Sequence, residues 1–515
     1  MPCGGWNQRT VLDAHARRAA SADQHTRRGN GRRRRDDRRY QRRPACRCYG
    51  IRRSRGRCRR RSCARHGAEV RRPGDASHVR SPRPASRPAA GSVARGLGEA
   101  PPGHRAPRHR AFDHVEFLVR ISSVTATPVR VPIYAPRLHS DGVTRSLDRI
   151  VIEVRTDEGV TGLGELGGRS PHARVRAAGD DIVGLDPFAT EELRGRLTGG
   201  KFADRGGNIL YAGFEMALLD IQGKTLGRPV SDLLGGQLRT SVPTTAYVFR
   251  LLDHDGRPAV RTADDIVAET ERLVAATGCT TIKFKAGSAA WAEDVAVTLA
   301  LRDRFRDHQL RVDPNAVWSL GTSLRAAAQL AEADLEWLED PVLGIEGMSQ
   351  VTARGGIPTA TNMCLTDWPE LPAAVAAHAV DVVLLDIYYL GGMRSAAGFA
   401  RACAAWQLGI GLHSGGAGAS ELGIGTAAVL QLAAALPTLI PAMDSMYSHV
   451  MDDVIVGGPL TFRDGSLTIP QQPGLGVELD ADKLAHYASV AAEATSANRR
   501  GPSSHGGKRP QYPAY

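Results

Sequence analysis

The sequence lacks a long hydrophobic run. Its 515 residues contain no stretch of 18 consecutive apolar residues, and the N-terminal region has no apolar core of the kind found in signal peptides. A membrane-spanning helix needs about 20 such residues, and a secretory signal needs its own short apolar segment. We therefore expect a cytoplasmic protein without a membrane partner.

Paired cysteines are also missing. The chain has eight cysteines, and no two stand in the C-x-x-C arrangement typical of zinc sites, which argues against a zinc centre. Five of them lie in the first 115 residues: Cys3, Cys46, Cys48, Cys58 and Cys63. The other three are isolated in apolar surroundings: Cys279, Cys364 and Cys403. We interpret these three as reduced thiols in the core of a cytosolic protein.

Lysine is absent from the first 115 residues, which hold 31 arginines and eight acidic residues. This balance of +23 leaves −10 for the other 400 residues, so the formal charge of +13 belongs to one end. Without apolar periodicity, residues 1–118 are expected to be disordered. A nucleic-acid-binding arm and an Arg-rich transit peptide both fit this composition. We favour translated GC-rich sequence ahead of the native start, because natural basic arms normally mix lysine with arginine.

Ordinary sequence begins near Val119 and predicts two domains. Residues 119–135 and 149–165 are β-branched and alternating, and 171–235 has helical periodicity, so we expect an α+β capping domain at 119–242. Over 243–455, eight short apolar runs alternate with helical segments, the last of them weak, which predicts an α/β TIM barrel of (β/α)7β type. Residues 456–490 are expected to return as strands that complete the capping domain, and 491–515 to be a disordered tail.

Polar residues end six consecutive strands of this predicted barrel. They are Lys283 and Lys285 on the second strand, Asp313 and Asn315 on the third, Glu339 and Asp340 on the fourth, Asn362 on the fifth, Asp386 on the sixth and His413 on the seventh. From Lys285 onward the steps are 23 to 28 residues, one βα unit each. Because barrel active sites are built at the C-terminal ends of the strands, these groups are expected to meet at one mouth.

Each of these residues also has a purely structural explanation. A K-x-K pair usually marks a solvated face, D-P-N a turn and E-D-P a strand exit, and a histidine after a strand is more often a core residue. In "TTIKFKAGS", however, Ile282 and Phe284 alternate with the lysines, so period-two geometry directs both lysines into the barrel. Six strands with unrelated polar groups at one level would be a coincidence, and we prefer the functional interpretation.

Three of the strand-end residues are oxygen donors. Asp313, Glu339 and Asn362 lie on adjacent strands, a set that suits a hard divalent cation, Mg²⁺ first. An amide in place of a third carboxylate makes the site less negative and leaves the ion a stronger Lewis acid.

Two other groups are candidate bases on opposite sides of this metal. Lys285 has a second ammonium, Lys283, two residues away, which would lower its pKa toward neutrality. His413 has Asp386 one strand away to orient and charge the imidazole. A metal between two opposed bases can remove a proton α to a carboxylate and stabilise the resulting ene-diolate.

Residues 119–490 resemble the mandelate racemase/muconate lactonizing branch of the enolase superfamily, and most closely its glucarate dehydratase group. The matching segments are "KFKAG", "DPNAVWSL", "EDP", "PTATNMCLTDW", "LHSGG" and "PGLGVELD". The asparagine of "TATNM" is the most discriminating, because most relatives have an acid there. Residues 1–115 do not share the resemblance. It implies a capped barrel that binds Mg²⁺ and forms a homo-oligomer.

The resemblance also implies roles for individual residues. The metal ligands would be Asp313, Glu339 and Asn362, with Glu346 as the alternative to Glu339. Lys285 would be one base, with Lys283 lowering its pKa and binding the substrate carboxylate; His413 with Asp386 would be the other base and the acid for the departing hydroxyl. The substrate contacts would be Asn315, Tyr247, Phe249, Ser414 and, from the loop "APRLHSDGVTR", His139.

Three departures from the glucarate enzymes concern the substrate. Those enzymes have asparagines after the serine that follows the strand-seven histidine, a histidine near strand eight, and a threonine before "AGFEMA". Here glycines follow Ser414, Met446 stands near strand eight, and the third position is Gly206 or Gly207. These positions contact the far end of a hexarate, so the departures imply a shorter, less hydroxylated or differently configured acid.

The function predicted from these observations is that of a Mg²⁺-dependent acid-sugar dehydratase, a carbon–oxygen lyase that gives a 2-keto-3-deoxy acid. Racemisation or epimerisation in the same site is the nearest alternative, because two opposed bases suffice for it. Binding of nucleic acid through the basic arm is an alternative of another class, and we do not expect it. An inactive member is disfavoured because every metal and base position holds a usable residue. The expected partner is a small-molecule acid sugar.

Overall fold

The computed structural model describes residues 119–498, apart from positions 169, 202–203, 415–420 and 441. All described residues belong to one unit, Pro107–Tyr515. The Arg-rich segment with its five cysteines, the glycines after Ser414 and the chain after residue 498 lie outside them. Cys279, Cys364 and Cys403 are buried free thiols, as predicted. None of the helices in the described ranges combines the length and the apolar character needed to cross a membrane.

The chain starts with a three-stranded antiparallel sheet of β1 (Ile121–His139), β2 (Gly142–Thr156) and β3 (Thr161–Gly167), in that order. This confirms that the alternating stretches 119–135 and 149–165 form strands. The segment "APRLHSDGVTR", however, is not a loop: β1 and β2 stay paired up to His139 opposite Gly142, and only residues 140–141 turn. Pro136 falls in an irregularity of the ladder between Pro132 and Arg137, where proline is tolerated, so it does not end the strand.

Four helices follow, α2 (His172–Ile182), α3 (Thr190–Thr198), α4 (Arg205–Leu226) and α5 (Val230–Leu233). The side chain of Asp204 caps α4 by accepting from the Gly207 N–H, and Gly227 ends it in the left-handed conformation, with φ of 65°. The helix lies directly on β3, where a Cβ at Gly162 would come within 2.0 Å of the Ala217 carbonyl oxygen. Glycine there allows the close approach that buries most of α4.

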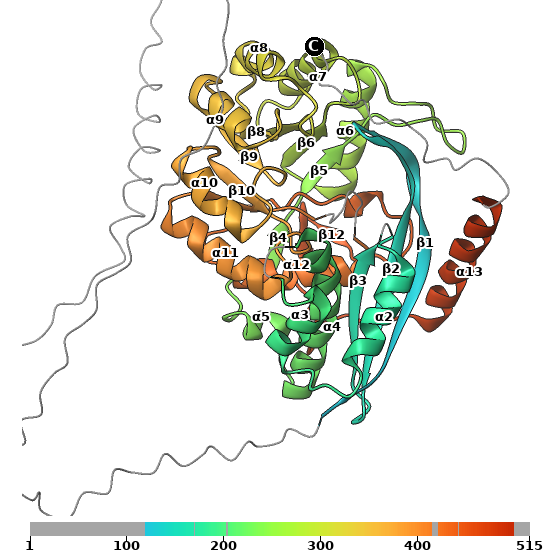
Figure 1. The fold of residues 1–515 in the computed structure, drawn as a ribbon. Coiled ribbons are helices and arrows are strands. Elements are labelled where there is room, and N and C mark those ends of the chain that lie inside the picture. The colour runs from blue at the N-terminus through green and yellow to red at the C-terminus, as the bar shows by residue number, and fades with distance from the viewer. Residues whose placement is uncertain (1–118, 169, 202–203, 415–420, 441, 499–515) are drawn as a thin grey trace, which may run out of the picture. The chain divides into compact units, whose positions relative to one another are not determined.

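Seven parallel strands then form one sheet in sequence order. They are β5 (Thr245–Val248), β6 (Thr281–Lys285), β7 (Gln309–Asp313), β8 (Trp337–Glu339), β9 (Thr359–Thr361), β10 (Val382–Leu385) and β11 (Gly409–Leu412). The intervening helices are α6 (Ala263–Thr277), α7 (Trp291–Arg304), α8 (Leu320–Leu330) with η1 (Ala331–Ala333), α9 (Ile345–Arg354), η2 (Trp368–Glu370), α10 (Leu371–Ala376), α11 (Met393–Ala405) and α12 (Gly423–Ala435). Figure 1 shows them surrounding the strands, as in a TIM-type barrel.

The eighth strand is present only as isolated bridges. Met443 pairs in parallel with Thr244, and Asp444 pairs in parallel with His413. The segment therefore lies between β11 and the start of β5 and closes the ring of strands. Only a short 3₁₀ turn, η3 (Tyr447–His449), follows. This confirms the predicted (β/α)7β arrangement with its weak last helix.

The C-terminal segment differs from its prediction. Only β12 (Phe462–Arg463) and β13 (Ser466–Thr468) are strands. They form a small sheet with β4 (Ser241–Pro243), which directly precedes β5, the first barrel strand. Residues 481–498 form a helix, α13 (Ala481–Asn498), that packs on β1 of the capping domain (Figure 1). The sequence favours this helix, since Asp480 accepts the Lys483 N–H at its start and alanines fill its interior.

Candidate active site

Lys285 ends β6, and its ammonium faces β7. Its Nζ lies 2.6 Å from Asp313 Oδ2 and 2.7 Å from Asn315 Oδ1. Asn315 has φ of 60°, a left-handed conformation that asparagine adopts more readily than most residues, and its N–H donates to Asp313 Oδ1. The structure thus brings these three sequence-predicted residues together.

Lys283 lies deeper in the barrel and is fully buried. Its Nζ is 2.6 Å from Glu339 Oε2, 2.8 Å from Asp444 Oδ2 and 3.6 Å from Asp313 Oδ2. Burial opposes its charged form, but Asp444 and Glu339 outweigh burial and raise the pKa of Lys283 well above its usual value. In this structure the ammonium pairs with protein carboxylates, and its predicted contact with a substrate carboxylate stays a prediction. The same carboxylates weaken its repulsion of Lys285.

Asp444 is a functional candidate that the sequence interpretation missed. Besides Lys283, it contacts Arg311, with 2.6 Å between Oδ1 and Nη1. Burial opposes ionisation of Asp444, but Lys283 and Arg311 outweigh it and lower its pKa. The signal was available, because Asp444 ends the last of the eight apolar runs, in the segment "LIPAMDS", just as the other polar residues end theirs. Arg311, two residues before Asp313 on β7, points inward by the same alternation.

His413 follows β11 and is buried together with Asp386, which follows β10. His413 Nδ1 lies 3.7 Å from Asp386 Oδ2, and neither atom has a hydrogen-bond partner in the described part of the chain. The sequence prediction that these residues are neighbours is met, but 3.7 Å is too long for a hydrogen bond. The other oxygen, Asp386 Oδ1, accepts the N–H of Tyr388 at 2.8 Å.

Ser414, the residue after His413, contacts Glu421. Its side chain is buried, and its hydroxyl donates to the carboxylate of Glu421. The predicted contact of Ser414 with substrate stays a prediction. Sequence reasoning could not have found Glu421, because nothing in the spacing indicates that it turns back onto the end of β11.

Aromatic side chains form one wall near Asp313. Tyr247 and Phe249 stack with ring centroids 4.7 Å apart, and the Tyr247 hydroxyl lies 3.4 Å from Asp313 Oδ2. His139 contacts the Phe249 ring edge-on at 5.2 Å, and Met446 packs in the same apolar cluster. The structure therefore places three predicted substrate contacts, Tyr247, Phe249 and His139, together, with Met446 in the same cluster.

Two buried basic residues behind this wall were also missed. The guanidinium of Arg137 lies 5.2 Å from the centre of the Phe249 ring, and burial lowers the pKa of Arg137 to about 10. His449 Nε2 lies 2.7 Å from the carbonyl oxygen of Tyr247. Burial, and then the charge of Arg137, lower the pKa of His449 well below its usual value, so its imidazole is neutral at pH 7. Neither residue lies at the end of a barrel strand, so the spacing pattern in the sequence did not indicate them.

The predicted metal ligands can be tested for fit. Asp313 and Glu339 both reach the ammonium of Lys283. Glu339 Oε1 is buried and has no hydrogen-bond partner among the described residues, and burial and Asp313 raise the pKa of Glu339 well above its usual value. A divalent cation would satisfy this oxygen, so the donors fit Mg²⁺.

The other two metal candidates differ in position. Asn362 directly follows β9, and its backbone N–H donates to Asp340 Oδ2 at 2.9 Å. Glu346 is exposed in the first turn of α9, which makes Glu339 the better second ligand. Within the described ranges no group of three His, Cys, Asp or Glu side chains could hold a metal ion. The candidate set is therefore the two carboxylates of Asp313 and Glu339 with the amide of Asn362.

Comparison with known proteins identifies the family. The description "Mandelate racemase / muconate lactonizing enzyme, N-terminal domain" matches residues 121–235, and "Enolase C-terminal domain-like" matches residues 265–483. A Streptomyces coelicolor protein described as "Probable glucarate dehydratase" is 38% identical over 395 residues, which cover 71% of this chain and 90% of that protein. The chain belongs to the enolase superfamily.

Solved enolase-superfamily structures have the same fold. An enolase from Mycobacterium smegmatis complexed with tartrate is 40% identical, with a TM-score of 0.69, over 73% of this chain and 93% of that one. An enolase from Thermobispora bispora complexed with magnesium and formate is 36% identical, with a TM-score of 0.70, over 77% of this chain and all of that one. The resemblance inferred from the motifs is therefore confirmed.

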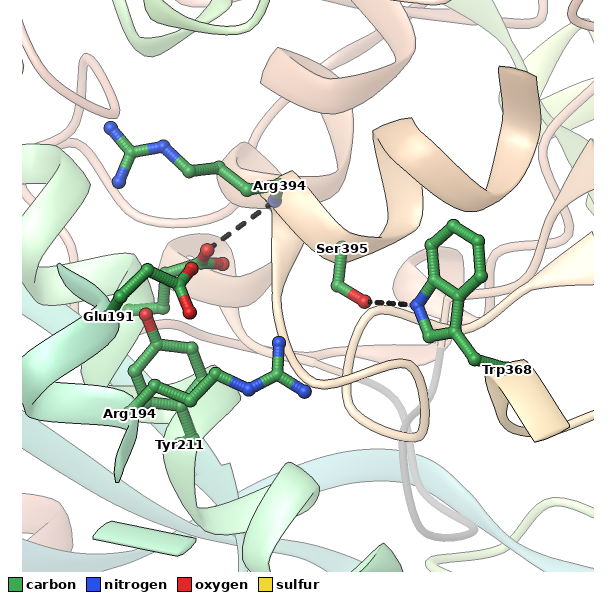
Figure 2. Close-up of a pocket in the computed structure, with 7 residues that line it drawn as sticks. Glu191, Arg194, Tyr211, Trp368, Arg394 and Ser395 are labelled. Atoms are coloured by element: carbon green, nitrogen blue, oxygen red, sulfur yellow. Dashed lines mark hydrogen bonds between the residues drawn. The ribbon is translucent and has the colours of Figure 1, made fainter. Parts of the chain in front are cut away.

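A separate pocket of about 330 Å³ lies between the capping helices and α11 of this enolase-superfamily barrel. Its lining residues are Glu191, Arg194, Tyr211, Glu215, Trp368, Arg394 and Ser395. Figure 2 shows Arg194 and Tyr211 on one side and Trp368 with Ser395 on the other, where the indole N–H donates to the serine hydroxyl at 2.9 Å. None of these residues ends a barrel strand, so the pocket is not part of the candidate active site.

Glu215, in the lining of this pocket, provides a pH prediction. Its carboxylate accepts the N–H groups of Met393 and Arg394, and burial raises its pKa to about 7. The unfolded chain releases this proton near pH ~4.3. The folded state therefore binds more protons between these values, and this contribution to stability falls as the pH rises. The free energy of unfolding, measured with urea, should fall between pH 4.5 and pH 8 by about 3 kcal/mol more in wild type than in Glu215→Gln.

The control is Glu191→Gln, because Glu191 is exposed on α3 and lines the same pocket. It should track wild type at both pH values. If Glu215→Gln and wild type differ by the same amount at both, the raised pKa of Glu215 is wrong.

Proposed function

We propose that this protein is a Mg²⁺-dependent acid-sugar dehydratase, a carbon–oxygen lyase of the enolase superfamily. The observation that carries the proposal is the grouping at one mouth of an ammonium, Lys285, and an imidazole, His413, with the carboxylates of Asp313 and Glu339 between their strands. The similarity to the Streptomyces coelicolor protein described as a glucarate dehydratase supports it.

The residues present account for the proton that is removed and for the proton that the leaving hydroxyl takes up. Lys285 or His413 takes the proton α to the substrate carboxylate, and the electron pair moves into a carbon–carbon double bond as the β-hydroxyl leaves. His413 donates a proton to that hydroxyl, so water is released. The enol product then ketonises to a 2-keto-3-deoxy acid. The buried carboxylate of Asp386 lies 3.7 Å from His413 Nδ1.

Asp313, Glu339 and Asn362 would hold the metal. Bound there, Mg²⁺ supplies positive charge beside the substrate carboxylate, where negative charge develops in proton removal. The magnesium in the related Thermobispora bispora structure supports this assignment.

The wall of the site favours an acid smaller or less hydroxylated than a hexarate. Tyr247, Phe249 and Met446 offer rings and a thioether where a polyol chain would need hydrogen-bond partners. The tartrate bound by the Mycobacterium smegmatis relative supports a hydroxy-dicarboxylic acid.

The decisive experiment is incubation in D₂O with a panel of aldaric and aldonic acids, with Mg²⁺ and with EDTA. A dehydratase should form a 2-keto acid, detected with semicarbazide, and only in the presence of Mg²⁺. Exchange of the α-proton for deuterium without any keto acid would instead establish a racemase or epimerase, the alternative that two opposed bases favour. If no acid exchanges or reacts, the proposed function is wrong.

A further inference from the structure

The β1–β2 hairpin of the capping domain contacts both halves of the candidate site. At its turn, Ser140 is buried, and its hydroxyl oxygen accepts a hydrogen bond of 2.9 Å from Asn315 Nδ2. The other end of the same amide, Asn315 Oδ1, accepts from Lys285 Nζ at 2.7 Å. A chain of two hydrogen bonds therefore joins the tip of the hairpin to the ammonium of Lys285.

The body of the hairpin reaches the opposite half through Arg149 of β2. Arg149 is fully buried; its Nε lies 2.6 Å from Glu165 Oε1, and its Nη2 donates to the hydroxyl of Tyr388 at 3.0 Å. The backbone N–H of Tyr388 in turn donates to Asp386 Oδ1 at 2.8 Å. Arg149 thus binds Tyr388, which in turn binds Asp386, the neighbour of His413.

Glu165 extends this contact to the segment after β11. Its two carboxylate oxygens accept the N–H groups of Leu422 and Gly425 at 2.9 and 2.8 Å, at the start of α12. The neighbouring Glu421 accepts the hydroxyl of Ser414, the residue that follows His413. Ser414 and Leu422, the described residues on either side of the connection from β11 to α12, are therefore both bound at this cluster, where Arg149 pairs with Glu165.

Stability alone does not explain a buried cluster of this kind. A buried ion pair is often no more stabilising than apolar residues of the same volume, because desolvation costs as much as the attraction returns. A guanidinium also orients its partners, because its N–H groups have fixed directions. The residues of this cluster are hydrogen-bonded to Asp386 through Tyr388 and to Ser414 through Glu421.

We propose that the β1–β2 hairpin positions the two bases independently, Ser140 acting on Lys285 through Asn315 and Arg149 acting on His413 through Tyr388 and Glu165. Ser140 and Arg149 are positioning residues, not catalytic ones. The inference rests on the proposed function, since it assigns the two bases their separate faces. It extends that function by giving the capping domain a role in the proton transfers themselves.

The test uses full-length protein with Mg²⁺ and the two enantiomers of tartrate, whose α-protons have opposite configurations. Exchange of each α-proton in D₂O is followed by NMR. Lys285→Met and His413→Asn first show which enantiomer depends on which base. The test variants are Ser140→Ala and Arg149→Met, with Tyr388→Phe as a milder variant in case Arg149→Met fails to fold.

Two residues of the same hairpin provide matched controls. Arg130 pairs with Asp148 through two contacts of 2.6 and 2.7 Å at a half-exposed position, and Ser146 donates to the same carboxylate at 3.0 Å. Arg130→Met and Ser146→Ala remove equivalent groups that do not reach the barrel mouth, and both should retain wild-type exchange with either enantiomer.

Ser140→Ala should lower exchange about 10- to 100-fold with the Lys285-dependent enantiomer and less than about 3-fold with the other. Arg149→Met or Tyr388→Phe should instead lower exchange mainly with the His413-dependent enantiomer. Losses of this size are expected because misplacement of a catalytic group by about 1 Å can lower a rate about 100-fold. Equal losses with both enantiomers, or none, overturn the inference. A second readout needs no turnover: the ¹⁵N shifts of the His413 imidazole, identified by their loss in His413→Asn. They should move in Arg149→Met and stay unchanged in Ser140→Ala.

The two proposals can fail separately. If wild type exchanges neither enantiomer and fails on the wider acid panel, the proposed function is wrong. The ¹⁵N shifts then still decide whether Arg149 positions His413, and unchanged shifts in Arg149→Met would overturn that half of the inference.

Discussion

Replacing Lys285 by methionine is expected to abolish removal of the α-proton on one face of the substrate while the protein stays folded. The ammonium makes the hydrogen bonds of this side chain to Asp313 and Asn315, and methionine keeps most of its volume. Loss of a general base costs about 10² to 10⁴ in rate. Exchange of the α-proton in D₂O, measured for substrates of both configurations, should fall by this factor for one configuration and change little for the other.

A matched control for Lys285→Met is Lys483→Met. Lys483 also pairs with an aspartate, Asp452 at 2.5 Å, but at a half-exposed position on α13. The Lys483→Met variant should exchange the α-protons of both substrates at the wild-type rate. Mg²⁺ binding, followed by the rise in melting temperature that it causes, should persist in Lys285→Met. Unchanged exchange with both configurations would remove Lys285 from the mechanism.

Replacing the neighbouring Lys283 by methionine is expected to cost stability. Lys283 is fully buried and lies within 2.8 Å of both Glu339 and Asp444, so its removal leaves buried carboxylates without their cation. Removing one partner of a buried ion pair typically costs about 3–5 kcal/mol. Urea unfolding at pH 7 in EDTA should show a loss of this size, against less than about 1 kcal/mol for the control Lys483→Met at the surface.

A second substitution can separate the loss of charge from the loss of packing. Glu339→Gln added to Lys283→Met removes one of the stranded carboxylates, so the double variant should regain part of the lost stability. Asp444 keeps Arg311 as a partner in both variants. If Lys283→Met unfolds at the wild-type urea concentration, Lys283 is not the charge that balances this cluster.

Much of the site could be predicted from the sequence because the parallel barrel turns spacing along the chain into proximity. One polar residue per βα unit puts Asp313, Glu339 and Lys285 at the same edge, and the alternation of "IKFK" decides that both lysines point inward. The roles of these residues, the domain boundaries, the cytoplasmic location and the homo-oligomer stay predictions.

Two contacts were missed for different reasons. Lys283 binds Asp444 because closure of the barrel brings together strands that are 161 residues apart in the chain. Ser414 and Glu421 are seven residues apart, but no local pattern indicates that the chain turns one onto the other. The segment "APRLHSDGVTR" was expected to be a loop, but pairing of Arg137–His139 with Gly142–Thr144 extends both strands to the turn.

By itself, the sequence determined the barrel, its strand ends and the inward direction of Lys283 and Lys285, since periodicity and spacing are local properties. Only the tertiary structure decided which carboxylate each lysine contacts and how the capping hairpin reaches them. Lys283 and Lys285 are two residues apart and chemically identical. Their environments differ because the barrel closes around one of them, where Asp444 of the last strand meets Lys283 of the second, and leaves the other beside Asn315 at the mouth.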